Sequence, residues 1–342
     1  LTYTFTTSGI WTIKLTATSD YGCSESKEYD ITVHDLPIAN FTSINNPSCV
    51  DDNVIFNGNT GILGGSTLSS TSLTLIEWDW DFDDGSCSTL PSCSLYNSTN
   101  NGDANHTYST NSSFNVTLTV TDDNGCISLP STNIIVTEAL PIASFTATTE
   151  CLGIPTQLDG TLSSSSTNTW IWEIYDPQES GGSVIQTTST PNHNYTFSTP
   201  GFHNVILTTS STLSNGQVCT SLPETVQVYV YHLPQPSFSF NIACESNYLG
   251  VNEITNFTDL TIPSIDAPIT IYDYVWTFGI NPAINLPPGN TSHPFGNPNF
   301  VTGYTVDLFV TDDNGCQNNF TTNNVQVSNL PPPSIDLLST IP

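Results

Sequence analysis

Short segments of alternating apolar and polar residues recur along the chain and predict β-strands. Within residues 114–120 the apolar side chains alternate with Asn and Thr, a period of two that is typical of a strand with one buried face. The apolar register recurs four times: Trp11, Ile13, Leu15 and Ala17; Phe114, Val116, Leu118 and Val120; His203, Val205, Leu207 and Thr209; Tyr304, Val306, Leu308 and Val310. We therefore expect an all-β protein.

A turn that carries glycine follows each of these strands and ends in cysteine. The hexapeptide TDDNGC occupies residues 121–126 and again 311–316, and the related stretches TSDYGC and SNGQVC end at Cys23 and Cys219. Glycine supplies the positive φ that such a turn needs. A last strand comes next and ends at a Leu-Pro pair, because proline cannot donate to a strand ladder.

Three markers repeat in one register and define a module of about a hundred residues. The cysteines that end the turns, Cys23, Cys126, Cys219 and Cys316, are 103, 93 and 97 residues apart. The Leu-Pro pairs, at 36, 140, 233 and 330, are 104, 93 and 97 apart. A third set, Cys49, Cys151 and Cys244, is separated by 102 and 93 residues. This size is usual for a small β-sandwich.

The markers divide the chain into five segments. The segments are 1–37, the C-terminal part of one module; 38–140, 141–233 and 234–331, three complete modules; and 332–342, the first strand of a following module. We call the first four the first to fourth modules. Because the linkers are only a few residues long, we expect the modules to lie end to end. The partial modules at the two ends predict a longer array, or a tail strand of one copy that pairs with the head of the next.

A tryptophan-centred strand precedes the alternating strand in each complete module. It reads WDWDF at 78–82, WIWEI at 170–174 and DYVWTF at 273–278. The aligned residues Trp80, Trp172 and Trp276 are predicted core anchors of a sandwich. The functional alternative is an aromatic platform for sugar, for which Trp78 and Trp170 are the paired candidates.

The charge of the chain is strongly one-sided. There are 31 acidic residues against two lysines, with no arginine, which gives a formal net charge of −29. Because phosphate recognition needs basic side chains, nucleic acid and anionic lipid are excluded as expected partners. No long apolar run is present, so we expect no membrane insertion. Expected partners are neighbouring modules or copies of the same protein, and glycans.

Nine cysteines at fixed module positions predict a disulfide framework in an extracellular or cell-surface setting. Zinc is disfavoured because the module cysteines are not closely spaced. Cys87 and Cys93 are expected to close their own small loop. No catalytic motif is present, and His106, His193 and His293 recur once per module, which favours a structural role. We expect no enzyme activity.

A cluster of carboxylates follows the first tryptophan strand. Asp79, Asp81 and Asp83 are expected on one face of the strand, and Asp84 begins the turn. Carboxylates this close repel one another unless solvent or a cation screens them. One interpretation is a solvated turn. The other is a calcium site with Asp81, Asp83 and Asp84 as ligands.

These motifs together resemble the PKD domain. WDFDDG at 80–85, NHTY at 105–108 and DDNGC at 122–126 occur in the order of that family. Asp83 replaces the family's usual glycine, and the third and fourth modules read WEIYDP and WTFGIN, so those two are recognised by register. The resemblance implies tandem immunoglobulin-like β-sandwiches in a microbial extracellular surface or filament protein.

The immunoglobulin-like strand order also bears on the disulfides. It places the cysteine after the first strand and the cysteine after the sixth at opposite ends of a module, too far apart to bond. Bonds between modules are then expected, Cys49 with Cys219 and Cys151 with Cys316. The alternative is pairing within modules, Cys49 with Cys126, Cys151 with Cys219 and Cys244 with Cys316.

The function expected for such a chain is a structural repeat segment of an extracellular fibre, filament or surface stalk, stiffened by short linkers and disulfides. One alternative is an adhesin or carbohydrate-binding module that uses the variable loops at 61–75, 88–104 and 280–297. Another is the spacer of a secreted hydrolase.

Overall fold

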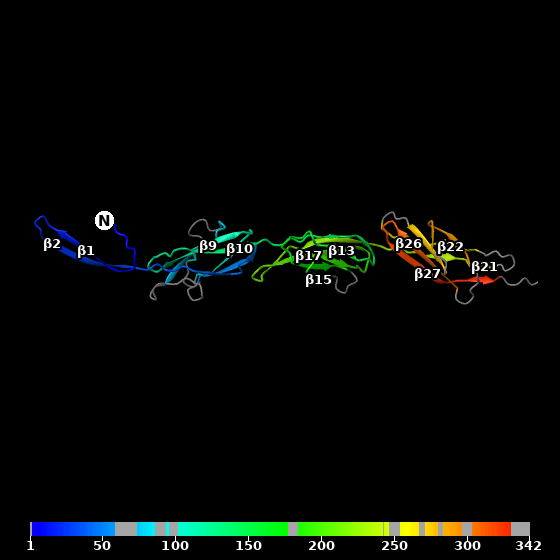
Figure 1. The fold of residues 1–342 in the computed structure, drawn as a ribbon, viewed down its shortest axis with the longest axis horizontal. Helices are drawn as coiled ribbons and strands as arrows, with labels where there is room; N and C mark the ends of the chain where they lie inside the picture. Colours follow the sequence, from blue (N-terminus) through cyan, green and yellow to red (C-terminus); the bar gives the residue numbers. More distant parts are fainter. Residues whose placement is uncertain are drawn as a thin grey trace, which may run out of the picture. The chain divides into compact units, whose positions relative to one another are not determined.

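The computed structural model describes residues 2–58, 74–85, 94–95, 102–176, 184–241, 243–245, 254–266, 271–279, 283–295 and 303–329. All regular structure in these ranges is β-strand (Figure 1). Within the same ranges, no helix has the length and apolarity needed to cross a membrane. The chain forms two compact units. Unit 1 contains Leu1–Ile142, Ser165–Asn168 and Thr209–Ser221; unit 2 contains Ala143–Ser164, Thr169–Thr208 and Leu222–Pro342.

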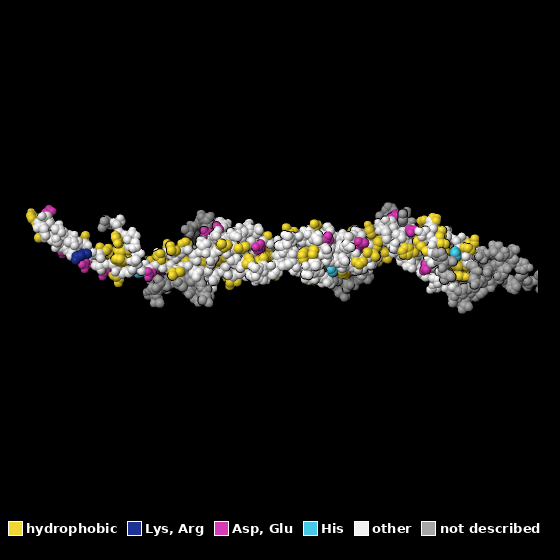
Figure 2. All heavy atoms as spheres, viewed as in Figure 1, with side chains coloured by type: hydrophobic (Ala, Val, Ile, Leu, Met, Phe, Trp, Pro, Cys, Tyr) yellow, Lys and Arg dark blue, Asp and Glu magenta, His cyan; other side chains and the backbone are white. Residues whose placement is uncertain are grey.

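Unit 1 begins with a two-stranded hairpin. Strands β1 (Gly9–Thr18) and β2 (Ser24–Val33) pair antiparallel along their whole length. Their apolar side chains are uncovered: Trp11, the aromatic residue of the predicted buried face, is 38% exposed. Figure 2 shows hydrophobic side chains at the surface of the hairpin. Lys14 pairs with Glu28 at 3.0 Å.

The second module is a sandwich of two sheets. One sheet has the order β3-β5-β8 and the other β4-β10-β9-β6-β7. The strands are β3 (Thr42–Ile44), β4 (Ser48–Cys49), β5 (Asn53–Asn57), β6 (Leu75–Asp81), β7 (Ser94–Leu95), β8 (Ala104–Thr107), β9 (Ser113–Asp122) and β10 (Ser131–Glu138). The first strand therefore changes sheets: its early part, β3, pairs with β5, and its late part, β4, pairs parallel with β10.

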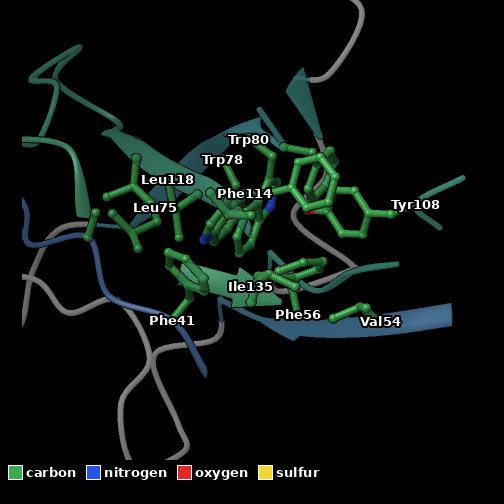
Figure 3. Packing of buried hydrophobic residues seen from close by; sticks show 14 residues of the cluster. Phe41, Val54, Phe56, Leu75, Trp78, Trp80, Tyr108, Phe114, Leu118 and Ile135 are labelled. Atoms are coloured by element: carbon green, nitrogen blue, oxygen red, sulfur yellow. The ribbon is translucent and has the colours of Figure 1, made fainter. Parts of the chain in front are cut away.

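The core of the second module lies between these two sheets. Alternation along β9 buries Phe114, Leu118 and their apolar neighbours, as the sequence pattern predicts. Figure 3 shows Phe41 and Phe56 packed against Trp80 across the core. The ring of Trp80 lies 4.9 Å from Phe41 and 5.4 Å from Phe56, within the range of favourable aromatic pairs.

The third module repeats this topology. Its sheets have the orders β11-β13-β16 and β12-β19-β17-β14-β15, and β18 pairs with the end of β17. The strands are β11 (Thr146–Ala147), β12 (Glu150–Cys151), β13 (Thr156–Asp159), β14 (Thr169–Ile174), β15 (Val184–Thr188), β16 (Asn192–Tyr195), β17 (Gly201–Thr212), β18 (Val218–Thr220) and β19 (Glu224–Tyr231). Strand β17 begins in unit 2, and its last residues lie in unit 1 with β18.

The fourth module, in unit 2, has the sheets β20-β22-β25 and β24-β23-β26-β27, and a parallel pair β21-β28. The strands are β20 (Phe238–Phe240), β21 (Ala243–Glu245), β22 (Ile254–Asp259), β23 (Ile271–Phe278), β24 (Ile284–Leu286), β25 (Thr291–Pro294), β26 (Tyr304–Asp312), β27 (Gln317–Val325) and β28 (Val327–Asn329). The predicted all-β fold class, with tandem β-sandwiches, is confirmed.

Each of the three buried clusters falls inside one predicted module. The clusters span residues 39–135, 143–230 and 238–325. The two compact units divide the chain differently, so the segment boundaries 1–37, 38–140, 141–233, 234–331 and 332–342 stay our proposal.

Candidate functional site

The first candidate site is a joint in unit 1, where a disulfide joins Cys49 of the second module to Cys219 of the third. The two α-carbons are 5.5 Å apart, and both cysteines are buried. Cys49 is held in β4, opposite Glu138 of β10. Cys219 is held in β18, opposite Ser211 of β17.

Two hydrogen bonds flank this disulfide. Asn215 Nδ2 donates to the carbonyl oxygen of Pro47 at 2.7 Å, and Gln217 Nε2 donates to Asp52 Oδ2 at 2.6 Å. Both donors belong to the turn between β17 and β18, which closes through Leu213 and Gln217. Cys219 therefore lies two residues beyond the place that the SNGQVC stretch suggested, inside a strand. We name this the first joint.

The second joint, in unit 2, is built on the other disulfide. Cys151 of β12 bonds to Cys316, with α-carbons 5.5 Å apart. Cys316 ends the second TDDNGC turn, where Asp312 Oδ1 accepts the backbone N–H groups of Asn314 at 3.0 Å and Cys316 at 2.8 Å. Asn318 Nδ2 donates to the carbonyl oxygen of Pro234 in the linker at 2.9 Å.

A buried carboxylate adds a polar cluster to the second joint. Asp266 of the fourth module accepts hydrogen bonds from the Tyr229 hydroxyl and from the His232 backbone N–H, the latter at 2.6 Å. The His232 ring Nδ1 lies 2.8 Å from Asp266 Oδ1, the oxygen that also accepts from Tyr229. Burial opposes ionisation of Asp266, but these bonds outweigh it and lower the pKa of its carboxyl group. The hydrogen bond to Asp266, with burial, raises the pKa of Tyr229 to about 12.

The structure therefore contains the pairing between modules and not the alternative within modules. Cys126, the within-module candidate for Cys49, has a free thiol and is half-buried, and Cys23 is free and exposed. The backbone of Cys244 lies in β21, but its side chain is outside the described residues. Cys87 and Cys93, the predicted small loop, also lie outside them.

The second interpretation of the acidic turn, a calcium site, finds no support among the described residues. Strand β6 ends at Asp81, and Asp83 is in the turn with φ 59°, so it is wrong to place it on the strand face. Asp81 Oδ1 accepts the N–H of Asp83 at 2.9 Å, and Asp83 Oδ2 accepts the N–H of Asn115 at 2.8 Å. Asp84 lies 2.7 Å from the ring of His106. No group of three acidic, His or Cys residues suited to a metal occurs among the described residues.

The left-handed conformation of Asp83 explains the family's usual glycine there, since glycine adopts positive φ without steric cost.

The tryptophans are core residues. Trp80, Trp172 and Trp276 are fully or almost fully buried. The proposed sugar platform is wrong, because Trp78 and Trp170 are buried too. A Cβ on Gly102 would lie 2.3 Å from the Trp78 ring, and one on Gly160 would lie 3.1 Å from the Trp170 ring, so glycine makes room for both indoles.

The recurrent histidines pack against the same aromatic cores. His106 stacks on Phe82 and His293 on Phe278, each with ring centroids 4.2 Å apart. His193 stacks on Trp172 at 6.3 Å, and burial lowers its pKa. Each histidine therefore packs against one aromatic ring of its module's core.

These features define the class of the protein: tandem immunoglobulin-like β-sandwiches with disulfides at the joints. Residues 37–136 match the family model of the PKD domain, so the second module belongs to the PKD domain family. No curated protein matches the sequence.

Solved structures show weaker likeness. Fibronectin(III)-like modules of Clostridium thermocellum CbhA share 17% identity over 54% of this chain and 95% of theirs, with a TM-score of 0.25. A bacterial ice-binding adhesin shares 11% identity over 87% of this chain and 100% of its own, with a TM-score of 0.35. Scores this low leave the family match as the basis of the classification.

Proposed function

We propose that this chain is a structural repeat segment of an extracellular fibre, filament or surface stalk. The observation that carries the proposal is the pair of disulfides between successive modules, Cys49 to Cys219 and Cys151 to Cys316. A disulfide within a module strengthens that module alone. One that crosses a joint also restricts bending and separation of the two modules, which suits a load-bearing array.

The two disulfide loops overlap, and together they form a covalent clamp on the second, third and fourth modules. The bonds close 170 and 165 residues of sequence, and residues 151–219 belong to both loops. The shortest covalent path from Cys49 to Cys316 therefore runs through the third module alone, about 70 residues, although about 270 residues separate them in sequence. Unfolding of the second or fourth module then adds little to the length of a stretched chain.

Composition and redox chemistry support an extracellular location. Disulfides of this kind persist in oxidising compartments and are rare in the cytosol. The net charge of −29 keeps closely packed copies soluble through mutual repulsion. Neighbouring modules of the same architecture are the proposed partners, and glycans attached at the surface are compatible with that setting.

The two other functions remain as alternatives, an adhesin or carbohydrate-binding module and a spacer of a secreted hydrolase. The loops proposed for adhesion lie mostly outside the described residues. The buried tryptophans remove the platform that a carbohydrate-binding function would have used.

Immunoelectron microscopy of the native source tests the proposal directly. Antibodies against residues 38–331 should label continuous fibres or stalks along their length. Label on a released enzyme, or only at the tips of surface structures, would favour the spacer or the adhesin and contradict the proposal.

Single-molecule stretching from the chain ends tests the clamp. Reduction should lengthen the fully extended chain by about 200 residues, or roughly 700 Å at ~3.5 Å per residue. The matched control is the Cys49→Ser, Cys151→Ser double variant, which should already be long before reduction. Equal lengths in both redox states would show that the overlapping loops are absent.

A further inference from the structure

The late part of the first strand occupies one register in all three complete modules. It pairs parallel with the last strand, and its cysteine stands opposite the residue two places before Leu-Pro. The pairs are Cys49 with Glu138, Cys151 with Tyr231, and Cys244 with Ser328. This register places each cysteine at the end of its module that leads into the next.

The second module also has a turn of the kind that receives such a cysteine. This turn, residues 121–126, lies near the linker that precedes the module, and its cysteine has no disulfide partner. Asp122 Oδ1 accepts the N–H groups of Asn124 and Cys126, both at 2.9 Å, as Asp312 does in the bonded turn. Cys126 is nevertheless a free thiol. The half-joint is therefore built to the same plan as the second joint.

An apolar hollow lies beside this half-joint, within unit 1. Its volume is about 380 Å³, and its lining consists of the linker 36–39 and residues 129–131. Ile38 and Leu129 form a parallel bridge there and remain 57% and 76% exposed. Isolated exposed apolar residues are ordinary, and here several of them line one hollow.

The second joint shows which apolar residue lies at the corresponding place. Its hollow, about 260 Å³, is lined by Leu152 together with Pro234 of the linker and Asn318. Leu152 follows Cys151 directly, so the disulfide and the apolar contact come from the same short segment. Pro37 and Ser128 are the sequence equivalents of Pro234 and Asn318 in the half-joint.

The β1–β2 hairpin supplies a strand edge with which an added strand could pair. Strand β2 pairs only with β1 within the described part of the chain, so its other edge is open. The residue two places before its Leu-Pro pair is His34. A parallel strand in the common register would put a cysteine opposite His34.

We propose that this half-joint is a docking site for the first strand of a preceding sandwich module of the same architecture. The occupant is a short extended segment in which cysteine is followed by an apolar residue. It pairs parallel with the end of β2, its apolar side chain packs against the hollow as Leu152 does at the second joint, and its cysteine bonds to Cys126. The inference rests on the proposed function and names the partner of that function's joint.

The bond forms by thiol–disulfide exchange. The partner cysteine arrives as a mixed disulfide with a small thiol such as glutathione. The Cys126 thiol loses its proton to solvent, and its thiolate attacks the partner sulfur. The new disulfide forms as the mixed one breaks, and the small thiol leaves with the electron pair and takes up a proton. The mixed disulfide is the oxidant.

A peptide with the sequence of residues 143–154, prepared as its glutathione mixed disulfide, tests the proposal on the full chain. Labelling of Cys126 and Cys23 is followed by mass spectrometry. We expect the peptide to label Cys126 at least tenfold faster than glutathione disulfide does. Cys23, which belongs to no described hollow, should react at similar rates with both reagents.

Two controls separate docking from thiol chemistry. A peptide with the Leu152→Asp change, and a chain with Leu129→Asp, should each lose most of the tenfold gain at Cys126. Leu129 is exposed, so that variant is expected to fold. Equal rates for the peptide and glutathione disulfide, or a gain unaffected by both changes, would overturn the docking site.

The outcome is independent of the fibre experiment. Docking without labelled fibres would retain the joint and reject the fibre function. Labelled fibres without docking would retain the function and reject this site.

Discussion

The two TDDNGC turns have identical sequences and almost identical internal structure. Asp122 and Asp312 each use Oδ1 to accept two backbone N–H groups. The glycines have φ of 79° and 81°. In both turns the aspartate N–H donates to the carbonyl of the final cysteine, at 3.1 Å and 3.0 Å. Six residues are thus sufficient to build this turn.

The two cysteines that end these turns nevertheless differ in chemistry. Cys316 is 0% exposed and bonded to Cys151, whereas Cys126 is a half-buried thiol. Burial, and then the charge of Asp122, raise the pKa of the Cys126 thiol. The comparison shows that local sequence places the sulfur, and that a segment distant in sequence decides whether it is bonded.

The largest expected difference between the turns is the contribution of the Cys151–Cys316 disulfide to the free energy of unfolding. The double change Cys151→Ser, Cys316→Ser opens a loop of 165 residues in the unfolded chain. It should lower the free energy of unfolding by about 2–5 kcal/mol, measured by guanidinium denaturation with tryptophan fluorescence. Cys126→Ser is the matched control and should change stability by less than about 0.5 kcal/mol. A comparable loss of stability in the double variant and in Cys126→Ser would contradict the difference in chemistry between the two turns.

Removal of the turn carboxylate should affect both turns equally. Asp122→Ala and Asp312→Ala each remove two hydrogen bonds to backbone N–H groups and should cost about 2 kcal/mol of unfolding free energy. Asp122→Asn and Asp312→Asn retain an acceptor oxygen and serve as controls with smaller costs. A much larger loss at position 312 would mean that the disulfide, and not the turn alone, depends on this carboxylate.

The turn glycines should also respond alike. Gly125→Ala and Gly315→Ala place a Cβ where no atom lies within 4 Å, so only the left-handed backbone opposes the change. The expected cost is about 1–2 kcal/mol at each position. Thermal unfolding of the two variants checks this, with Gly85→Ala (φ 78°) as a control outside the repeated turns. Unequal costs would show that the joint constrains one turn more than the other.

The smallest expected effect is on the pH dependence of alkylation at the Cys126 thiol. Because its pKa is raised, its thiolate fraction at pH 8 is below that of an ordinary cysteine, and alkylation should accelerate at a higher pH. Asp122→Asn removes the second cause and should shift the rate profile of iodoacetamide labelling to lower pH. Because burial also raises the pKa of Cys126, part of the rise should persist in the Asp122→Asn variant. A profile unchanged by this substitution would assign the whole shift to burial.

The third cysteine turn extends the comparison. It closes through Leu213 and Gln217, and Cys219 lies two residues further, in β18. Its turn residues Asn215 and Gln217 instead supply the hydrogen bonds across the first joint. A disulfide between modules can therefore be presented by a turn end or by a strand.

The modules, the alternating strands and the tryptophan cores could all be predicted from the residues, because strand period and glycine turns are local properties that repeat along the chain. The sequence did not determine that Asp83 leaves the strand, since a left-handed turn residue is not encoded by charge or alternation. Nor did it show that Trp78 and Trp170 are buried, because the glycines against which they pack, Gly102 and Gly160, come from other parts of the fold.

The disulfide partners depend on how the modules fold and meet. Cysteine spacing alone left Cys49 open to Cys126 or Cys219, and only the strand order implied by the family resemblance favoured Cys219. A bond requires α-carbons within about 7 Å, and that distance depends on which ends of the sandwiches meet. The first strand changes sheets and carries its cysteine beside the last strand, so the partner comes from the following module.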